Sequence, residues 1–186
     1  PITTIKGVLN VARLEKAAEP GCEKYSSMIE RSTDKLNDFV TNIIHYYQNM
    51  KSDELLEKID MQALVDEIIE KYRHYDGADK VTFRTDINSS APFLGDSHRM
   101  RMVIGNIISN AIRYHDPRKT ESTVYIDIVQ NRDKAIVRIT DNGIGIDEKL
   151  MPEIFEMFTK SDGKNVGAGI GLYIAREAMK KLGGKI

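Results

Sequence analysis

"AIVRITDNGIGID", residues 135 to 147, is a predicted strand that ends in a glycine-rich turn. Its first half alternates apolar and polar residues, as a half-buried strand does. The chain then leaves the strand at Asp141 and places Gly143 and Gly145 within three residues. An Asp-Asn-Gly sequence forms a tight turn readily. The same residues also fit a backbone that a flat, polar ligand approaches closely while Asp141 accepts its hydrogen bonds.

The residues around this stretch predict an α+β domain in which helices alternate with antiparallel strands. The strand over 123–130 joins the strand over 135–141 in hairpin fashion. Such an alternation favours a two-layer α+β sandwich, with helices covering one sheet. The other predicted elements are an amphipathic helix over 61–73, a strand over 81–87, a helix over 96–115 opened by a capping acid and serine, a short helix over 149–157 and a last helix over 170–182.

The first 55 residues predict a helical hairpin. Helical spacing runs over 2–19 and again over 22–50, and Pro20-Gly21 separates the two patterns. A hairpin with one wide apolar face commonly pairs with a second copy into a four-helix bundle, so we expect a homodimer. The stripe on the second helix consists of Met28, Ser32, Leu36, Phe39, Ile43, Tyr46 and Met50. The charged stretch 51–60 marks the boundary between domains 1–55 and 56–186.

Composition narrows the function classes. The net charge of −1 and the interspersed basic residues argue against nucleic acid as a partner. The single cysteine, Cys22, rules out an internal disulfide framework and fits a reducing compartment, so we expect a cytoplasmic protein. No apolar stretch approaches the roughly 18 residues of a membrane span, so any membrane contact would come through segments absent from this chain.

Two asparagines in the helix predicted over 96–115 are candidate ligands. Asn106 and Asn110 lie four residues apart and share one helical face, and Arg113 follows one turn later. Amide oxygens suit a hard cation such as Mg²⁺, and a guanidinium suits a phosphate. The alternative is that these side chains only pair locally on a solvated face, and the spacing alone leaves both open.

The glycine run "GAGIGL", residues 167 to 172, precedes the last predicted helix. Bare backbone amides and the positive end of the helix dipole make an anion site at such a position. A flexible loop before a helix has the same composition, so the run by itself leaves both interpretations open.

In combination, these features resemble the nucleotide-binding domain of sensor histidine kinases. The resemblance rests on the helix with two asparagines, the D-x-G-x-G turn, the pair Phe155 and Phe158 in "IFEMF", and the G-x-G-x-G-L run, in this order. That domain belongs to the superfamily shared with gyrase, Hsp90 and MutL. The resemblance covers nearly the whole chain, because the predicted hairpin is similar to the dimerisation and phosphotransfer domain of these kinases.

The resemblance implies ATP and Mg²⁺ as ligands and assigns roles to single residues. Asn110, with Asn106, would hold the Mg²⁺ that bridges the phosphates, and Arg113, where the family more often has lysine, would contact phosphate. Tyr114 would lie along the adenine, and Asp141 would accept the hydrogen bond of its exocyclic amine. The further nucleotide-binding residues implied are Gly143, Gly145, Ile146, Lys160, Lys164, Gly167, Gly169, Gly171 and Leu172.

Two of these implied roles concern backbone approach and a lid. Gly143 and Gly145 would let the backbone pass close to the base, beside the apolar Ile146. Residues 159–166 would form a mobile lid over the phosphates. Phe155 and Phe158 would anchor the base of that lid, although plain core packing explains two phenylalanines equally well.

The resemblance also implies parts that lie outside the chain. "PITTIKG", residues 1 to 7, is similar to the segment directly after the H-E-L-R-T-P motif of the family, which places the acceptor histidine about five residues before Pro1. After "GGKI" the family continues with further glycines and two strands. The histidines that the chain does contain are interpreted as structural or site-lining residues: His45, His74, His98 and His115.

The leading hypothesis is therefore a two-component histidine kinase core. ATP would phosphorylate a histidine, and the phosphoryl group would pass to an aspartate of a response regulator. ATP hydrolysis of the gyrase or Hsp90 kind is disfavoured, because the glutamate that activates water there is replaced by Asn106. A dimeric scaffold that binds ATP without phosphotransfer is the alternative. The chain would be cytoplasmic or the cytoplasmic part of a membrane-bound sensor.

Overall fold

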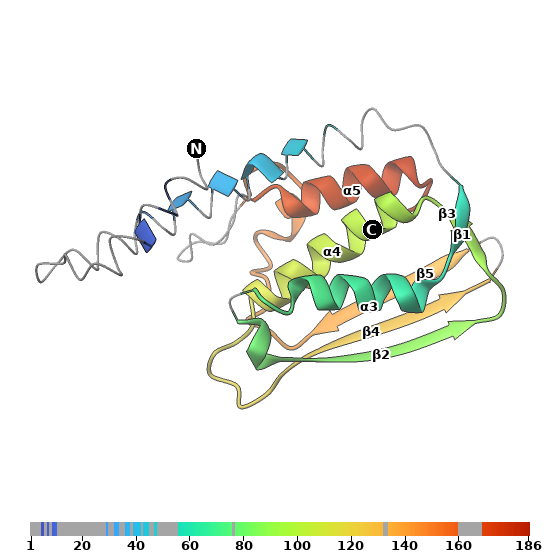
Figure 1. The fold of residues 1–186 in the computed structure, drawn as a ribbon, viewed down its shortest axis with the longest axis horizontal. Coiled ribbons are helices and arrows are strands. Elements are labelled where there is room, and N and C mark those ends of the chain that lie inside the picture. Colours follow the sequence, from blue (N-terminus) through green and yellow to red (C-terminus); the bar gives the residue numbers. More distant parts are fainter. Residues whose placement is uncertain are drawn as a thin grey trace, which may run out of the picture.

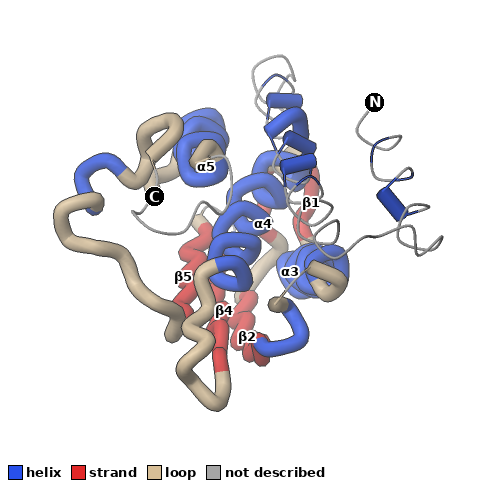
Figure 2. Tube along the Cα trace, turned by 90° about the vertical axis from the view of Figure 1, so that its left-hand side faces the viewer, coloured by secondary structure: helices blue, strands red, loops and turns tan. Residues whose placement is uncertain are grey.

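Three helices cover one face of a three-stranded sheet. The computed structural model describes residues 56–75, 77–131, 134–159 and 169–186, together with single helical positions before residue 56. Seen along the strands, the helices form one layer and the sheet the other (Figures 1 and 2). The predicted α+β sandwich is confirmed. The helices are α3 (Met61–Tyr72), α4 (Ser97–Arg113) and α5 (Gly171–Lys181), and the strands are β2 (Val81–Ser89), β4 (Ser122–Gln130) and β5 (Ala135–Asp141).

The sheet has the order β2-β4-β5. β4 and β5 pair antiparallel as predicted, with Ile126 opposite Ile139. β2 and β4 pair parallel, with Thr85 opposite Ile126, so the expectation of antiparallel strands is wrong for this pair. The reason is the connection: the chain leaves β2, crosses the sheet through α4 and returns in the same direction, as parallel neighbours require.

Short elements were the least predictable. β1 (Glu57–Ile59) lies in the charged stretch expected to be a linker, and it pairs antiparallel with β3 (Phe93–Gly95). Three residues are too few for a period-two pattern to stand out. The helix expected over 149–157 is a single 3-10 turn, η2 (Met151–Glu153), followed by turns, and a second such turn, η1 (Ala78–Lys80), precedes β2. No side chain caps η2, and its proline lacks a backbone donor.

The core between the layers fixes α4 in place. Inward-pointing residues of the central strand β4 are at most 1% exposed, and residues four apart on α4 face them. Burying such aliphatic side chains contributes about 1.5–3 kcal/mol each. This packing fixes the position of α4, and with it the face of α4 that points away from the sheet. The residues concerned are Val124, Ile126 and Ile128 of β4 and Ile104, Ile108 and Ile112 of α4.

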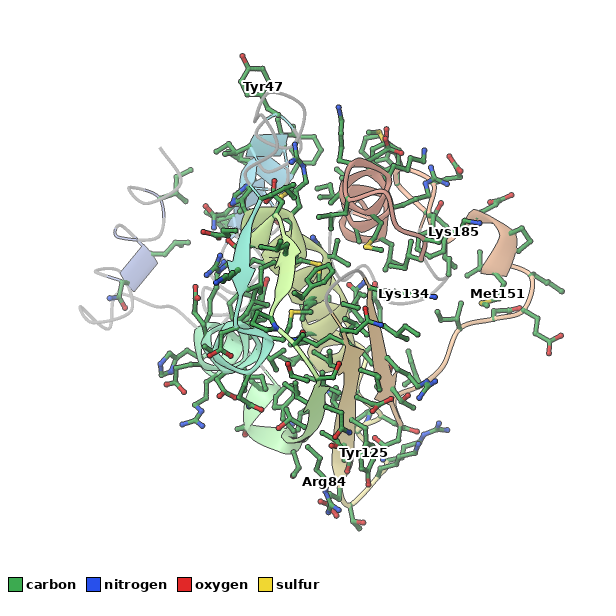
Figure 3. All side chains as sticks on the ribbon, turned by 90° about the vertical axis from the view of Figure 1, so that its right-hand side faces the viewer. Tyr47, Arg84, Tyr125, Lys134, Met151 and Lys185 are labelled. Carbon is green, nitrogen blue, oxygen red and sulfur yellow. The ribbon has the colours of Figure 1, made fainter. Side chains whose placement is uncertain are left out.

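The outer face of the sheet carries polar pairs, together with the exposed apolar pair Val129 and Ile136. Arg84 of β2 lies beside Tyr125 of β4, its cross-strand partner, with the guanidinium carbon 5.7 Å from the ring centroid (Figure 3). On the next pair of strands, Arg138 forms an ion pair with Asp127 at 2.7 Å. These pairs lie on the sheet face without helices. The candidate site described below lies among the helices, on the other face.

The positions described in the first 55 residues are all helical, as the two predicted helices require. The hairpin turn and the bundle lie outside the described residues and stay predictions. Leu36 and Ile43 of the predicted stripe are half exposed, at 50% and 47%. Phe39 differs, because it packs against Met102 of α4 and the start of α5. Among the described residues, no helix combines the length and apolarity that crossing a membrane requires.

Candidate functional site

Helix α4 supplies the centre of the candidate site. It begins after Asp96, whose side chain accepts a hydrogen bond from the backbone N–H of Arg99 at 2.9 Å, so the predicted acidic cap is confirmed. Asp96 and the Arg99 side chain also form a buried ion pair. This double connection sets where the first turn starts. The face of α4 that turns away from the core carries Asn106, Asn110 and Arg113.

A cavity of about 240 Å³ lies against that face. It brings together four residues that the sequence predicted for a nucleotide site: Asn106, Asn110, Arg113 and, from α5, Gly171. No described aspartate or glutamate lines it. The cavity therefore offers amides and cations, a composition that suits an anion. The other lining residues are Thr41, Lys71, Tyr72, Tyr75, His98, Arg101, Met102 and Ser109.

Asn106 joins α4 to the start of α5. Its Nδ2 donates to the carbonyl of Met102 at 2.7 Å, which turns Oδ1 toward α5. A Cβ at Gly171 would lie 2.7 Å from that oxygen, so a larger residue there would displace the Asn106 amide from its present orientation. The N-cap residue of α5, Ile170, provides no side-chain cap. Backbone amides at the start of a helix favour an anion, and those of α5 lie beside Asn106.

The Asp-Asn-Gly turn is held by its own side chains. Asp141 Oδ1 accepts a hydrogen bond from the backbone N–H of Gly143 at 2.8 Å. Asn142 Oδ1 accepts from the N–H of Thr123 at 2.9 Å, and its Nδ2 donates to the carbonyl of Glu121 at 3.1 Å. The tight-turn interpretation is confirmed, and Asn142, which the sequence did not single out, is the residue that ties the turn to β4.

The same turn docks on the end of α4. The carbonyl of Tyr114 accepts a hydrogen bond from the N–H of Ile144 at 3.0 Å, and a Cβ at Gly143 would lie 2.4 Å from that carbonyl oxygen. The close approach that Gly143 permits is thus to the protein's own helix. Gly145 has a different reason, because its φ of 75° lies in the left-handed region and no atom crowds it.

The site residues lie at successive positions along α4. The turn with Asp141 lies at Tyr114, and Asn110 and Asn106 follow about 6 Å and 12 Å further along the helix axis. Asp141 is exposed, as is the neighbouring Ile146. The structure does not place them in the lining of the cavity, nor Tyr114, Gly143, Gly145, Gly169 and Leu172.

Phe158 and Gly169, which flank most of the segment predicted to be a lid, are joined to each other and form what we call the neck. Phe158 donates its backbone N–H to the carbonyl of Gly169 at 2.8 Å. Both residues have left-handed φ, 67° for Phe158 and 70° for Gly169, and a Cβ at Gly169 would meet Thr159 O at 2.8 Å. Phe158 is 60% exposed, so core packing does not explain it, whereas Phe155 is half-buried. Lys160, Lys164 and Gly167 lie outside the described residues.

An ion pair connects the segment before the neck to α5. Arg176 Nη1 and Glu156 Oε1 are 2.9 Å apart. This hydrogen bond lowers the pKa of the Glu156 carboxyl and raises the pKa of the Arg176 guanidinium. The pair holds the neck next to the helix whose first turn contacts Asn106.

Several lining residues were missed from the sequence. Ser109 lies three residues from Asn106 on α4, so the spacing contained a signal for it, whereas Arg101 lies five residues from Asn106 and off that face. His98, already interpreted as a structural or site-lining residue, does line the cavity. Lys71 and Tyr72 come from α3, and only the packing of α3 on α4 brings them to the cavity. No pattern in the sequence predicts that approach.

Comparison with known proteins identifies the family. Residues 95–186 match the family described as histidine kinase-, DNA gyrase B- and HSP90-like ATPase, and this range holds α4, the turn and α5. The chain carries the nucleotide-binding core of a sensor histidine kinase. The resemblance inferred from the four sequence features is confirmed.

The curated relatives of this kinase core are larger proteins. The chain is 26% identical to the signal transduction histidine-protein kinase BarA of Escherichia coli over 99% of its own length, but spans only 21% of BarA. It is 29% identical to the sensor protein kinase WalK of Staphylococcus aureus, of which it spans 46%. The sensor protein TorS of Escherichia coli is 34% identical over half of the chain and a tenth of its own length.

Solved structures share the fold. The mycobacterial sensor histidine kinase MprB is 26% identical, with a TM-score of 0.57 over 69% of this chain and 81% of that one. Full-length ShkA in complex with AMPPNP has a TM-score of 0.64 at 24% identity over 97% of this chain and 39% of that one. The histidine kinase AdeS of Acinetobacter baumannii has a TM-score of 0.63 at 20% identity, covering 97% of this chain and 83% of AdeS.

Proposed function

We propose that the chain binds ATP with Mg²⁺ and presents the γ-phosphoryl group to a histidine, as the catalytic part of a two-component kinase. One observation carries the proposal. The cavity beside Asn106, Asn110 and Arg113 has no acidic lining among the described residues, opens at the uncapped start of α5, and lies on the helix whose far end holds the Asp141 turn. The phosphates of ATP would thus bind beside Asn106, Asn110 and Arg113, and the adenine would bind at the Asp141 turn near the end of the same helix.

Asp141 and its neighbours would bind the adenine. The Gly143 N–H occupies Asp141 Oδ1, which fixes the carboxylate plane and leaves Oδ2 to accept from the exocyclic amine. Exposed Ile146 and half-buried Tyr114 would cover the faces of the base. The turn needs no rearrangement to bind, since Asn142 already holds it to β4.

Asn110 and Asn106 fit a magnesium ion bound together with phosphates. Their amide oxygens are hard ligands, and Asn106 Oδ1 is already oriented by its own Nδ2 bond to Met102. When bound, the ion would neutralise phosphate charge during transfer. Arg113 and the amides of α5 would bind the phosphate oxygens, while Lys160 and Lys164 are further proposed contacts.

The lining disfavours hydrolysis as the main reaction. A water attacking the γ-phosphoryl group needs a base, and no described carboxylate lines the cavity. Transfer to an external acceptor needs only positioning on this side. We therefore propose an acceptor histidine before Pro1, on a hairpin over 1–55 that dimerises, and a response regulator aspartate as the final acceptor.

Asp141→Asn tests the adenine role. The amide can turn its NH₂ toward the adenine amine and lacks the charge, so nucleotide affinity should fall by about 2 kcal/mol or more, roughly thirtyfold. Calorimetric titration with ATP measures this change. Asn88→Asp, on the outer face of the sheet, is the matched control and should bind as the unmutated chain does. Equal affinity of the Asp141 variant would remove this residue from the site.

Asn110→Ala tests the metal role. The loss of affinity should be larger for ATP with Mg²⁺ than for ATP without it, and adenosine binding should hardly change, because only the phosphate end is affected. The same calorimetric titration, repeated with the three ligands, separates these effects. An identical loss for all three would contradict the assignment.

Phosphotransfer is tested with γ-labelled ATP. A version extended upstream to include the proposed histidine, and downstream to complete the domain, should acquire acid-labile, base-stable label, whereas residues 1–186 alone should not. If the extended version binds ATP without becoming labelled, the scaffold alternative holds. Label on His45 or His115 would place the acceptor within the chain.

A further inference from the structure

Two residues of α3, Lys71 and Tyr72, line the cavity but have no part in the nucleotide contacts proposed above. Lys71 and Tyr72, at the end of α3, face α4 across the cavity that contains Asn106 and Asn110. A nucleotide bound as proposed would enter from the Asp141 end, so these two residues lie where its phosphate tail would end.

Tyr72 of α3 contacts α4 beside Gly105, at a distance that would leave room for a Cβ in ordinary van der Waals contact. A Cβ at Gly105 would lie 3.4 Å from the hydroxyl oxygen of Tyr72, so the ring of Tyr72 rests on α4 one residue before Asn106. The ammonium of Lys71 lies 5.7 Å from the centroid of that ring. Lys71 therefore lies beside a ring that contacts α4 next to Asn106, and both Lys71 and Asn106 line the cavity.

Lys71 and the neighbouring Arg101 differ in whether a carboxylate pairs with their positive charge. Arg101, one turn before Gly105, donates Nε and Nη2 to Glu67 at 3.2 and 3.1 Å and Nη1 to Ser97 at 2.9 Å. Its charge is therefore neutralised within the protein. For Lys71, no carboxylate of the described residues lies within ion-pair distance, and its neighbour is an aromatic ring. An ammonium without a carboxylate partner among the described residues suits a phosphate oxygen.

We propose that Lys71 binds the terminal phosphate of the nucleotide, so that the site distinguishes a nucleoside triphosphate from a diphosphate. The inference rests on the proposed nucleotide site and adds a specificity determinant from a helix that the sequence did not connect with it. The order along α4 supports it. In the proposed arrangement the base would lie at the Tyr114 end and the metal-bound phosphates at Asn110 and Asn106, which line the same cavity as Lys71, so the terminal phosphate would reach Lys71.

Lys71→Gln tests this role by a ratio of affinities. Titration with Mg²⁺ and either ADP or the non-hydrolysable imido analogue of ATP should show a loss of about tenfold for the triphosphate and less than about twofold for ADP. Lys71→Arg should retain the preference for the triphosphate. Arg73→Gln is the matched control, because it removes one positive charge two residues away, from a side chain that pairs with Glu70 and lies outside the cavity lining.

Each outcome has a separate meaning. If Lys71→Gln weakens both nucleotides equally, or resembles Arg73→Gln, the terminal-phosphate role is wrong while the nucleotide site stands. The same holds if the unmutated chain does not prefer the triphosphate. If the unmutated chain binds neither nucleotide, the proposed function itself fails and the inference falls with it. Unchanged ADP affinity in Lys71→Gln also shows that this variant is folded.

Discussion

Asn106 shows how one uncharged side chain can organise a site. Its amide nitrogen donates a hydrogen bond to the Met102 carbonyl of its own helix, and a Cβ on Gly171, the first residue of α5, would lie 2.7 Å from its oxygen. An amide stays neutral at every pH that the protein experiences. A carboxylate at this position would repel phosphates and could activate water, so the amide favours binding over hydrolysis.

Asp116 gives a pH-dependent prediction at the same scale. Its carboxylate accepts hydrogen bonds from the Arg118 guanidinium at 2.9 Å, which lowers the pKa of Asp116 to about 2 from 3.8. A lowered folded-state pKa means stabilisation that is present above about pH 4 and lost as the pH falls toward 2. Asp116→Asn should therefore be less stable than the unmutated chain near pH 7. Urea unfolding at several pH values should show this difference shrinking below pH 4, and a constant difference would contradict the assignment.

At the scale of elements, α4 is the axis of the site, and the turn after β5 is fixed to its end. Two glycines of that turn act for different reasons. Gly143 avoids a backbone oxygen that would lie 2.4 Å from a Cβ, whereas Gly145 supplies a left-handed φ in open space. Gly143 therefore serves the contact of the turn with Tyr114, and Gly145 serves the conformation of the turn itself.

Replacing each glycine by alanine should separate these reasons. Gly143→Ala must displace the turn from α4, so it should weaken nucleotide binding and lower the melting temperature. Gly145→Ala should cost only about 1–2 kcal/mol of stability, the penalty of a left-handed alanine. Thermal unfolding and nucleotide titration of both variants provide the comparison. A Gly145→Ala variant that is the more damaged of the two would contradict the steric explanation.

The same elements show what a sequence pattern can predict. The strong 3.6-residue period of α4 and the alternation in β4 and β5 predicted these elements within about two residues, because each buries one face. The shared face of Asn106, Asn110 and Arg113 followed from the same period. The parallel pairing of β2, the β1–β3 ribbon and the approach of Lys71 depend on tertiary packing, and no local pattern encodes them.

At the scale of the whole molecule, several apolar side chains before residue 56 are exposed, and no described residue buries them. Leu36 and Ile43 are half exposed at helical spacing, together with Val40 and Ile44. Tyr47 points away from the nucleotide-binding domain (Figure 3). Phe39, which belongs to the same predicted stripe, packs against α4 and the start of α5. An exposed stripe of this kind favours pairing with a second copy.

Ile43→Asp should dissociate the proposed dimer. A charge placed in a buried interface costs several kcal/mol, enough to shift the association by orders of magnitude. Light scattering of the chain without nucleotide should give a dimer before the substitution and a monomer after it. Tyr125→Asp, at a residue that is 49% exposed on the outer sheet face, is the control and should remain dimeric. A stable monomer for the unmutated chain would overturn the prediction.

The neck between Phe158 and Gly169 makes the segment between them exchangeable. Its two ends are joined by a backbone hydrogen bond, and the Arg176–Glu156 ion pair holds the base, so neither anchor depends on the residues inserted between them. For a flexible connection between two fixed ends, doubling the length costs only about 0.6 kcal/mol in closure entropy. We therefore expect that residues 160–168 can be replaced by a segment of another length or charge. The hydrogen bond between Phe158 and Gly169 and the ion pair between Arg176 and Glu156 should stay in place.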